Sequence, residues 1–173
     1  MRLLVIRHAI AVDRDSFART GEPDSLRPTT ASGLKKMRQI VIGLRTLVPR
    51  LHVLASSPFV RARQTAELLQ KPYAIAEIAN VPELSPDRQP VELVNWLTML
   101  DVTSGDYTVA VVGHEPHLGQ LVSFLLTGRR RPFVEMRKGG ACLLDLGEEP
   151  APGSATLRWL AGSRLLRAAG HGA

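Results

Sequence analysis

Residues 3–8 are Leu-Leu-Val-Ile-Arg-His, four apolar residues followed at once by an arginine and a histidine. A short continuous apolar run is typical of a strand that is buried on both faces, as in a parallel sheet. Two further apolar runs end as abruptly, residues 51–55 at Ser56-Ser57-Pro58 and residues 107–112 at Gly113-His114. If these strands are parallel neighbours, their polar ends meet at one edge of the sheet, where α/β folds bind ligands.

Helical patterns separate these strands. Residues 31–47 carry apolar side chains at helical spacing, with Thr30 as a good N-cap and Pro49 closing the helix. The patterns also predict helices at about 59–69, 91–100 and 116–126, strands at 74–76, 141–146 and 155–160, and a long loop at 10–29. This alternation predicts an α/β protein, a three-layer α/β/α sandwich with a mostly parallel central sheet.

The length and composition fit one globular domain. The chain has 173 residues, of which 45% are hydrophobic and 22% charged. We expect a single domain over residues 1–165 and a partly ordered tail over residues 166–173. Cys142 is the only cysteine, which excludes an intramolecular disulfide, and no segment approaches the ~20 apolar residues of a membrane span. The expectation is a cytoplasmic monomer that does not contact membranes.

The net charge is strongly positive, +6 with a pI near 10.2, and this favours an anionic partner. The basic residues are mostly arginines and are spread along the chain. The densest run, Arg129-Arg130-Arg131, fits a solvated loop, and its role stays open. Aromatic residues make up only 5% and offer no platform for stacking bases, so no nucleic acid partner is expected.

Arg7-His8 is the first element that carries chemistry. A neutral imidazole nitrogen can attack phosphorus, and the phosphoramidate that it forms hydrolyses readily. The phosphoryl oxygens need cations around them in the transition state, and Arg7 supplies part of that frame. Taken alone, the dipeptide also fits a strand-end histidine that caps a carbonyl.

Residues 56–66, Ser-Ser-Pro-Phe-Val-Arg-Ala-Arg-Gln-Thr-Ala, form the second element. Arg61 falls in the first turn of a helix that begins near Pro58, where free N–H groups and the helix dipole favour an anion. An arginine there can hold a phosphate with two hydrogen bonds. Arg63 lies two positions further and points elsewhere, as a surface or ion-pairing residue.

The third element is Gly113-His114-Glu115-Pro116-His117. Gly113 permits a tight exit from the strand, and His114 can donate to a phosphoryl oxygen. His117 lies about one helical turn later and fits either the same pocket or a packing role. Zinc ligation by the two histidines would need an acidic partner, and Glu115 points away from both on a helix, so no metal site is expected.

These three elements are specific when they occur in this order. With Arg7-His8-Ala9, Ser57–Ala66 and Gly113–His117, the chain resembles the histidine phosphatase superfamily, in particular its SixA-like phosphohistidine phosphatase branch. The resemblance covers about residues 1–165, because Arg27-Pro28-x-Thr30-x-x-Gly33 and Pro82–Pro86 also fit that branch. Ala9 stands where the usual signature has glycine, and its small side chain is expected to fit.

The resemblance implies a phosphoglycerate mutase-like fold and a metal-independent phosphatase without cofactors. Arg7, His8, Arg61 and His114 would form the phosphate pocket, with His8 as the nucleophile. Inorganic phosphate, sulfate or vanadate would bind in the pocket, and His117, from its position one turn after His114, is a candidate for a further substrate contact beside its packing role. Residues 67–106 are too few for a large lid insertion, so the pocket is expected to be shallow. That shape suits phosphohistidine on a phosphotransfer protein of a phosphorelay.

The general acid is the least determined assignment. Glu83 and Asp87 lie in the candidate loop, and Glu83 is preferred because it belongs to the motif at 82–86. A phosphoramidate is labile enough to need less acid assistance than an ester, so no side chain at all is a third possibility. Two other functions stay open. One is a small-molecule phosphomonoesterase of the same superfamily, with Glu83 as its acid. The other is a non-catalytic phosphate- or nucleic-acid-binding module, which would have no need of a nucleophile.

Overall fold

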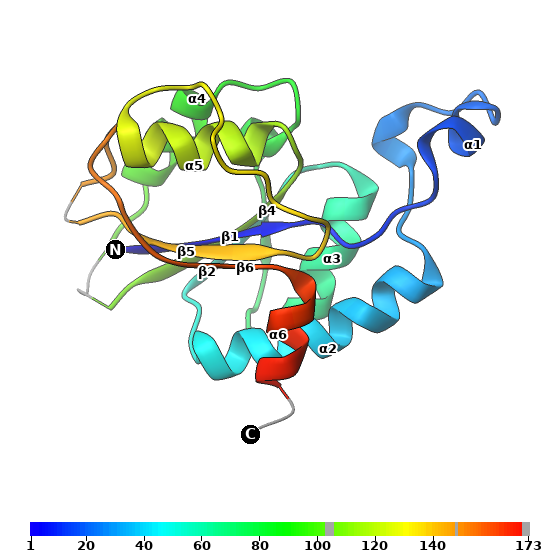
Figure 1. Cartoon of the computed structure of the whole chain (residues 1–173), viewed down its shortest axis with the longest axis horizontal. Helices are drawn as coiled ribbons and strands as arrows, with labels where there is room; N and C mark the ends of the chain where they lie inside the picture. The colour runs from blue at the N-terminus through cyan, green and yellow to red at the C-terminus, as the bar shows by residue number, and fades with distance from the viewer. Residues whose placement is uncertain (103–105, 148, 171–173) are drawn as a thin grey trace.

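A central sheet lies between two helical layers in the computed structural model, which describes residues 1–102, 106–147 and 149–170 (Figure 1). One face is covered by α2 (Ala31–Leu47), α3 (Val60–Gln70) and α6 (Ser163–Ala169). The other is covered by α4 (Pro90–Thr98) and α5 (His117–Thr127). The predicted three-layer α/β/α sandwich is confirmed.

The described sheet has six strands in the order β3-β2-β4-β1-β5-β6. Their bounds are β1 (Arg2–Arg7), β2 (Val53–Ser56), β3 (Ile78–Asn80), β4 (Thr108–Gly113), β5 (Ala141–Asp145) and β6 (Thr156–Ala161). The pairs β3–β2, β2–β4 and β4–β1 are parallel, whereas β5 runs antiparallel to β1 and β6. The sheet is mostly parallel, as predicted, and the carboxyl ends of β2, β4 and β1 lie side by side.

The interior of each central strand is apolar because its two faces belong to two different cores. In β1, Leu3 and Val5 pack on the α4/α5 side, while Leu4 and Ile6 pack on the α2/α3/α6 side. All four side chains are fully buried, and each contributes about 1.5–3 kcal/mol. The two cores hold the strand ends rigidly, which fixes whatever side chains follow them.

Two local expectations differ from the structure. The strand expected at 74–76 lies instead at Ile78–Asn80, because the chain first turns out of α3 with Ala74 at a φ of 53°. The loop expected at 10–29 contains the short helix α1 (Arg14–Ala18) and the 3₁₀ turn η1 (Asp24–Leu26). This loop projects beyond the carboxyl ends of the strands (Figure 1).

The tail is more ordered than expected up to residue 170. The division expected at residue 165 falls inside α6, whose Leu166 is fully buried. Gly43 of α2 makes this packing possible, because a side chain there would overlap the Leu166 carbonyl. Residues 171–173, also part of the expected tail, lie outside the described residues.

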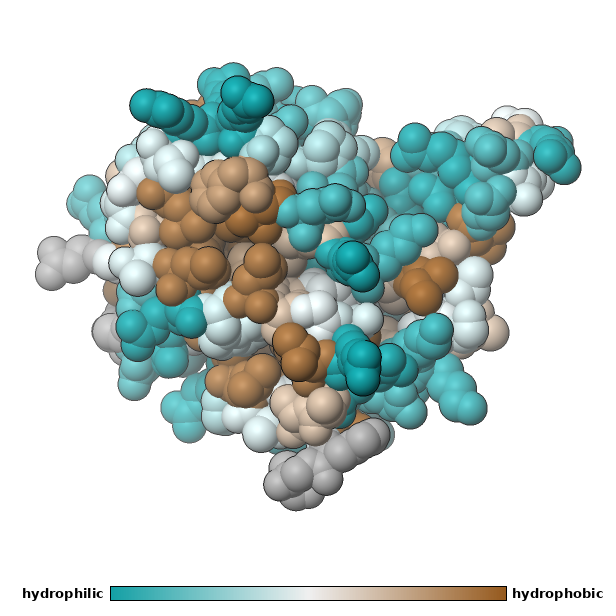
Figure 2. Space-filling view, in the orientation of Figure 1, coloured by the Kyte–Doolittle hydropathy of each residue, from teal (hydrophilic) through white to brown (hydrophobic). Residues whose placement is uncertain are grey.

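β6 is the edge strand, and its pairing with β5 is irregular. Leu143 pairs with Trp159 but Leu144 pairs with Leu157, so Arg158 has no partner residue on β5. The shift places Leu157 and Leu160 on the same side of the sheet, at 40% and 43% exposure. Figure 2 shows apolar side chains gathered on the face where β5 and β6 run.

None of the helices in the described part of the chain is both long and apolar enough to cross a membrane.

Candidate active site

The structure brings the three predicted strand ends together. His8 follows β1, Ser57 follows β2 and His114 follows β4, and the register sets Arg7 opposite Gly113. The rings of His8 and His114 have centroids 5.0 Å apart, and His114 Nε2 lies 2.9 Å from Ser57 Oγ. The sheet topology alone therefore places two imidazoles in contact.

His8 is held as a neutral imidazole with a defined tautomer. Its Nδ1 lies 2.7 Å from the Ala9 carbonyl oxygen, which can only accept, so Nδ1 carries the proton and Nε2 keeps its lone pair. Burial is the main cause that lowers the pKa of His8 to about 3; the bond to Ala9 opposes it, and the charges of Arg61, Arg7 and Arg27 act in the same direction as burial. At neutral pH the ring is therefore uncharged.

His114 is also neutral. Burial lowers its pKa to about 2, with smaller effects from His8 and Arg61. The Ser57 hydroxyl oxygen accepts from the Phe59 N–H at 3.3 Å, so its own proton is available for His114 Nε2. In that arrangement His114 Nδ1 carries a proton, and this buried nitrogen has no partner within the described residues.

Arg61 lies in the first turn of α3, as predicted, and its side chain is only 2% exposed. It donates from Nη1 to the Asp24 carbonyl at 2.7 Å and from Nη2 to Asp24 Oδ2 at 2.9 Å. Its Cζ also lies 4.9 Å from the centre of the Phe59 ring, a cation–π distance. The guanidinium is therefore fixed in place by its neighbours.

Sequence reasoning missed Asp24 and Arg27 as parts of this cluster. Arg27 is buried and donates from Nε to Asp24 Oδ1 at 2.7 Å and from Nη1 to the Val12 carbonyl at 2.7 Å. Burial alone would raise the pKa of Asp24, but the hydrogen bond from Arg27 and the charges of Arg61, Arg27 and Arg14 hold it below its ordinary value. Arg27 does stand in the Arg-Pro-x-Thr segment, the one signal that pointed to it.

Arg7 is anchored from the other side of the sheet end. Its Nη1 donates to the Met136 carbonyl at 2.6 Å, and the Met136 N–H donates to Glu115 Oε1 at 2.7 Å. The expectation that Glu115 lies on a helix is wrong, because α5 begins only at His117. Glu115 instead accepts from the N–H groups of Met136 and Gly119, and burial raises its pKa.

The remaining predicted residues are placed less directly. His117 is fully buried in the first turn of α5, which fits packing rather than contact with a substrate; burial lowers its pKa to about 4. Glu83 is half-buried on the 3₁₀ turn η2 (Pro82–Leu84). The bond from the Val81 N–H to the Ser56 carbonyl sets η2 at the end of β2, on the same edge as the site. Arg63 points outward and pairs with Glu67 at 3.6 Å, as expected.

The described residues contain no group of three or more histidine, cysteine, aspartate or glutamate side chains arranged to hold a metal ion.

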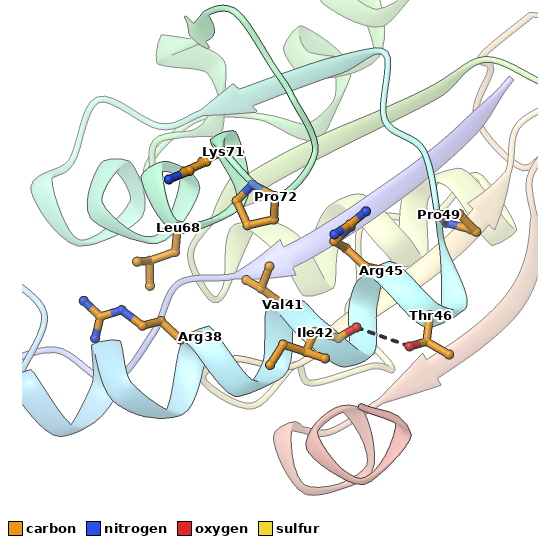
Figure 3. Close-up of a pocket in the computed structure, with 9 residues that line it drawn as sticks. All are labelled: Arg38, Val41, Ile42, Arg45, Thr46, Pro49, Leu68, Lys71 and Pro72. Atoms are coloured by element: carbon orange, nitrogen blue, oxygen red, sulfur yellow. Dashed lines mark hydrogen bonds between the residues drawn. The ribbon is translucent and has the colours of Figure 1, made fainter. Parts of the chain in front are cut away.

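A hollow of about 660 Å³ lies elsewhere, between the far ends of α2 and α3 (Figure 3). Its walls are Arg38, Val41, Ile42, Arg45, Thr46, Pro49, Leu68, Lys71 and Pro72. Arg61 lies in the first turn of α3 beside the site, whereas Leu68 of the same helix lines the hollow seven residues later, about 10 Å along the helix. The hollow is therefore separate from the histidine pair.

Two neutral histidines and three arginines at the carboxyl edge of an α/β/α sandwich define a class of enzyme that handles phosphoryl groups. Comparison with known proteins agrees. The chain is 31% identical over 151 residues to an uncharacterized protein of Picosynechococcus sp., covering 85% of this chain and 86% of that protein. It is 29% identical to the phosphohistidine phosphatase SixA of Escherichia coli, covering 92% of each chain.

The solved structures give the same result. The structure of the protein histidine phosphatase SixA complexed with tungstate matches with a TM-score of 0.80 and 26% identity, over 96% of this chain and 99% of that chain. No family model matches the chain. The chain belongs to the histidine phosphatase superfamily, in its SixA-like branch with the phosphoglycerate mutase-like fold, and it is a phosphatase.

Proposed function

We propose that this phosphatase removes the phosphoryl group from phosphohistidine on a phosphotransfer protein, through a covalent phosphohistidine on His8. One observation carries the proposal above all others. The bond from His8 Nδ1 to the Ala9 carbonyl leaves Nε2 unprotonated among the charges of Arg7, Arg27 and Arg61. A neutral nucleophile inside a cationic frame is the arrangement that attack on a phosphoryl group requires.

The reaction proceeds in two transfers. In the first, His8 Nε2 forms a bond to phosphorus while the bond from phosphorus to the substrate nitrogen breaks, and that nitrogen keeps the electron pair and takes up a proton. In the second, water attacks the phosphorus of phospho-His8, losing a proton as inorganic phosphate leaves and Nε2 regains its lone pair. Glu83 is the preferred source of the first proton, and a labile phosphoramidate makes only a small demand on it.

Three buried hydrogen-bond donors support the binding of phosphoryl oxygens. Arg7 Nε, Arg61 Nε and His114 Nδ1 are buried and have no hydrogen-bond partner within the described residues. Buried donors of this kind are costly to leave unpaired, so an oxyanion that satisfies all three binds with a large gain. Because arginines supply the positive charge, we propose that turnover needs no divalent metal.

The arrangement of the chain around the site and the relatives of this protein support the proposed substrate class. Residues 67–106, where described, are taken up by β3, η2 and α4, which leaves no insertion to form a lid from this part of the chain. A phosphorylated side chain on a protein surface needs such access. The similarity to a phosphohistidine phosphatase over 92% of the chain supports the same substrate class.

The proposal is tested by steady-state hydrolysis of phosphohistidine and of p-nitrophenyl phosphate, with EDTA present, by wild type and His8→Ala. We expect preference for phosphohistidine and complete loss of turnover in His8→Ala, with the variant still folded at the assay temperature as checked by its thermal unfolding curve. Preference for the ester would transfer the assignment to a small-molecule phosphomonoesterase and make Glu83→Gln the next variant. Loss of wild-type turnover in EDTA, restored by a divalent cation, would refute metal independence.

A further inference from the structure

One basic surface beside the site has no part in the chemistry described so far. Residues 128–140, here called the 128–140 segment, connect α5 to β5 and pass across α4 and α5 to the carboxyl end of β1 (Figure 1). The segment contains the run that sequence analysis left without a role. It carries five exposed cations against a single acid, Glu135: Arg129, Arg130, Arg131, Arg137 and Lys138.

The positive charges of these five side chains are not neutralised by acidic side chains of the described residues. None of the ion pairs formed by described residues involves any of the five cations. Arg130 donates to the neutral Gln89 Oε1 at 2.8 Å, at the start of α4, and so lies against the loop that follows η2. The uncompensated charge therefore remains available to an acidic partner.

An exposed aromatic side chain lies among these basic residues. Phe133 is 63% exposed and separates two shallow hollows. The first, about 520 Å³, is lined by Thr127, Arg129, Arg131, Pro132 and Phe133. The second, about 570 Å³, is lined by Glu115, Pro116, Pro132, Phe133, Val134 and Glu135. Aromatic and arginine side chains are enriched among the residues that contribute most of the binding energy at protein interfaces.

The segment is held in a fixed shape. The Phe133 N–H donates to Ser123 Oγ at 3.1 Å, and the Met136 N–H donates to Glu115. Gly119 of α5 lets the chain pass close, because a Cβ there would lie 2.5 Å from the Val134 carbonyl oxygen. A surface that is ordered before binding loses little entropy when a partner arrives.

The segment also lies within reach of a protein bound at the site. The Met136 carbonyl accepts from Arg7, and the Gly139 N–H points to the carbonyls of Arg7 and His8. Phe133 lies three positions before Met136, so their Cα atoms are at most about 11 Å apart. A standard interface covers about 800 Å² of each partner, a disc about 16 Å in radius, so a protein that presents its phosphohistidine to His8 can extend along the segment toward Phe133.

We propose that the 128–140 segment is the docking surface for the phosphoprotein substrate, taking acidic side chains against Arg129 and Arg131 and an apolar side chain against Phe133. This inference rests on the proposed function. The same cations suit a nucleic acid, but the phosphoryl acceptor at the end of the segment favours an acidic protein. Docking of this kind lowers KM for the protein substrate and leaves small substrates unaffected.

The test compares one variant, Arg129→Glu/Arg131→Glu, on two substrates: free phosphohistidine and an acidic histidine-containing phosphotransfer domain phosphorylated with phosphoramidate. We expect KM for the phosphorylated domain to rise by about tenfold or more with kcat unchanged, and the difference to shrink in about 500 mM salt. Phe133→Ala is expected to raise the same KM by about fivefold at any salt concentration. Turnover of free phosphohistidine is expected to stay within about twofold of wild type.

Arg38→Glu/Arg45→Glu is the matched control, since it changes the net charge equally on two exposed arginines at the remote hollow (Figure 3). An equal rise of KM in the control would show that the effect comes from the overall charge of the protein, and it would overturn the docking surface. If Arg129→Glu/Arg131→Glu leaves KM and kcat for the phosphorylated domain unchanged while free phosphohistidine is turned over normally, the docking surface is refuted and the proposed function is not. Failure of wild type to hydrolyse either the phosphorylated domain or free phosphohistidine would refute the proposed function and the docking surface with it. Arginine-dependent binding of a single-stranded RNA, with phosphoprotein turnover unchanged, would assign the surface to nucleic acid instead.

Discussion

Two segments border the candidate active site. Each holds one arginine in place, but with different contacts. Residues 9–30, the 9–30 loop, project past the strand ends and fix Arg61, while the 128–140 segment crosses α5 and fixes Arg7. The 9–30 loop holds its arginine with a carboxylate, Asp24, and the 128–140 segment uses only the Met136 carbonyl. A carboxylate that is paired with an arginine offsets its charge, as Asp24 does for Arg61. Arg7 forms no ion pair with a described carboxylate and is influenced only by the charges of Glu115 and Glu135 nearby. The two arginines are thus expected to contribute unequally.

The largest effect is expected from removing each arginine in turn. Arg7→Ala is expected to lower kcat/KM by on the order of 10³, because its charge is not offset by a hydrogen-bonded carboxylate. Arg61→Ala is expected to lower it by about 10² and to weaken inhibition by vanadate. Steady-state kinetics with phosphohistidine measure both. Equal losses would show that Asp24 does not offset Arg61, and unchanged vanadate inhibition would remove Arg61 from the pocket.

A second pair of variants tests how each segment is supported, because each one passes over a helix glycine. A Cβ at Gly119 would meet the Val134 carbonyl, and a Cβ at Gly33 of α2 would overlap the Ile10 carbonyl. Gly119→Ala and Gly33→Ala are each expected to lower the free energy of unfolding by about 1–3 kcal/mol, as measured by urea denaturation. Gly162→Ala is the control, since a Cβ there has open space. A neutral result at Gly119 would mean that the 128–140 segment moves freely.

The pH dependence of stability tests the ring that lies between the two segments. His8 has a folded pKa of about 3, below its unfolded value near 6.5, so between these values the unfolded chain binds more protons. Stability is therefore complete above about pH 6.5 and falls as the pH is lowered through that window. His8→Gln is expected to reduce the slope by up to about 1.4 kcal/mol per pH unit. Identical slopes in denaturation series at several pH values would contradict a neutral His8.

The smallest effect is expected from neutralising the carboxylate of the 9–30 loop. Asp24→Asn keeps a side-chain oxygen for Arg61 and removes a negative charge beside the phosphoryl pocket. Vanadate is therefore expected to inhibit this variant about three- to fivefold more strongly, since the screened interaction is worth less than about 1 kcal/mol. Inhibition constants at low ionic strength measure it. Weaker inhibition would show that the carboxylate acts by positioning Arg61 rather than by its charge.

The same contrast explains what the sequence could predict. His8 and His114 were predictable because each directly follows a buried strand, and the order of such strands brings their ends together. Arg61 was predictable because it stands one residue into a helix that begins beside the same edge. In each case a short stretch of chain determines both the element and the position of the side chain.

The missed residues depend on contacts between distant parts of the chain. Asp24 and Arg61 are 37 residues apart and meet only because the 9–30 loop folds back over α3. Glu115 was expected on a helix, whereas α5 begins at His117 and the glutamate accepts from the N–H of Met136, 21 residues further along the chain. No local spacing encodes either contact. The same holds for α6, whose packing depends on a glycine more than a hundred residues earlier in the chain.

The irregular pairing at β6 bears on how readily a strand from another molecule can add to this edge of the sheet. An edge strand with two leucines on one side offers free backbone groups and apolar surface, which together invite a strand from another molecule. Arg158 sits at the shift, exposed and without a partner on β5, and the kink interrupts the row of backbone groups at that point. A regular strand could not be laid along the whole edge without burying that charge. The irregularity thus disfavours the addition of strands from other molecules to this edge of the sheet.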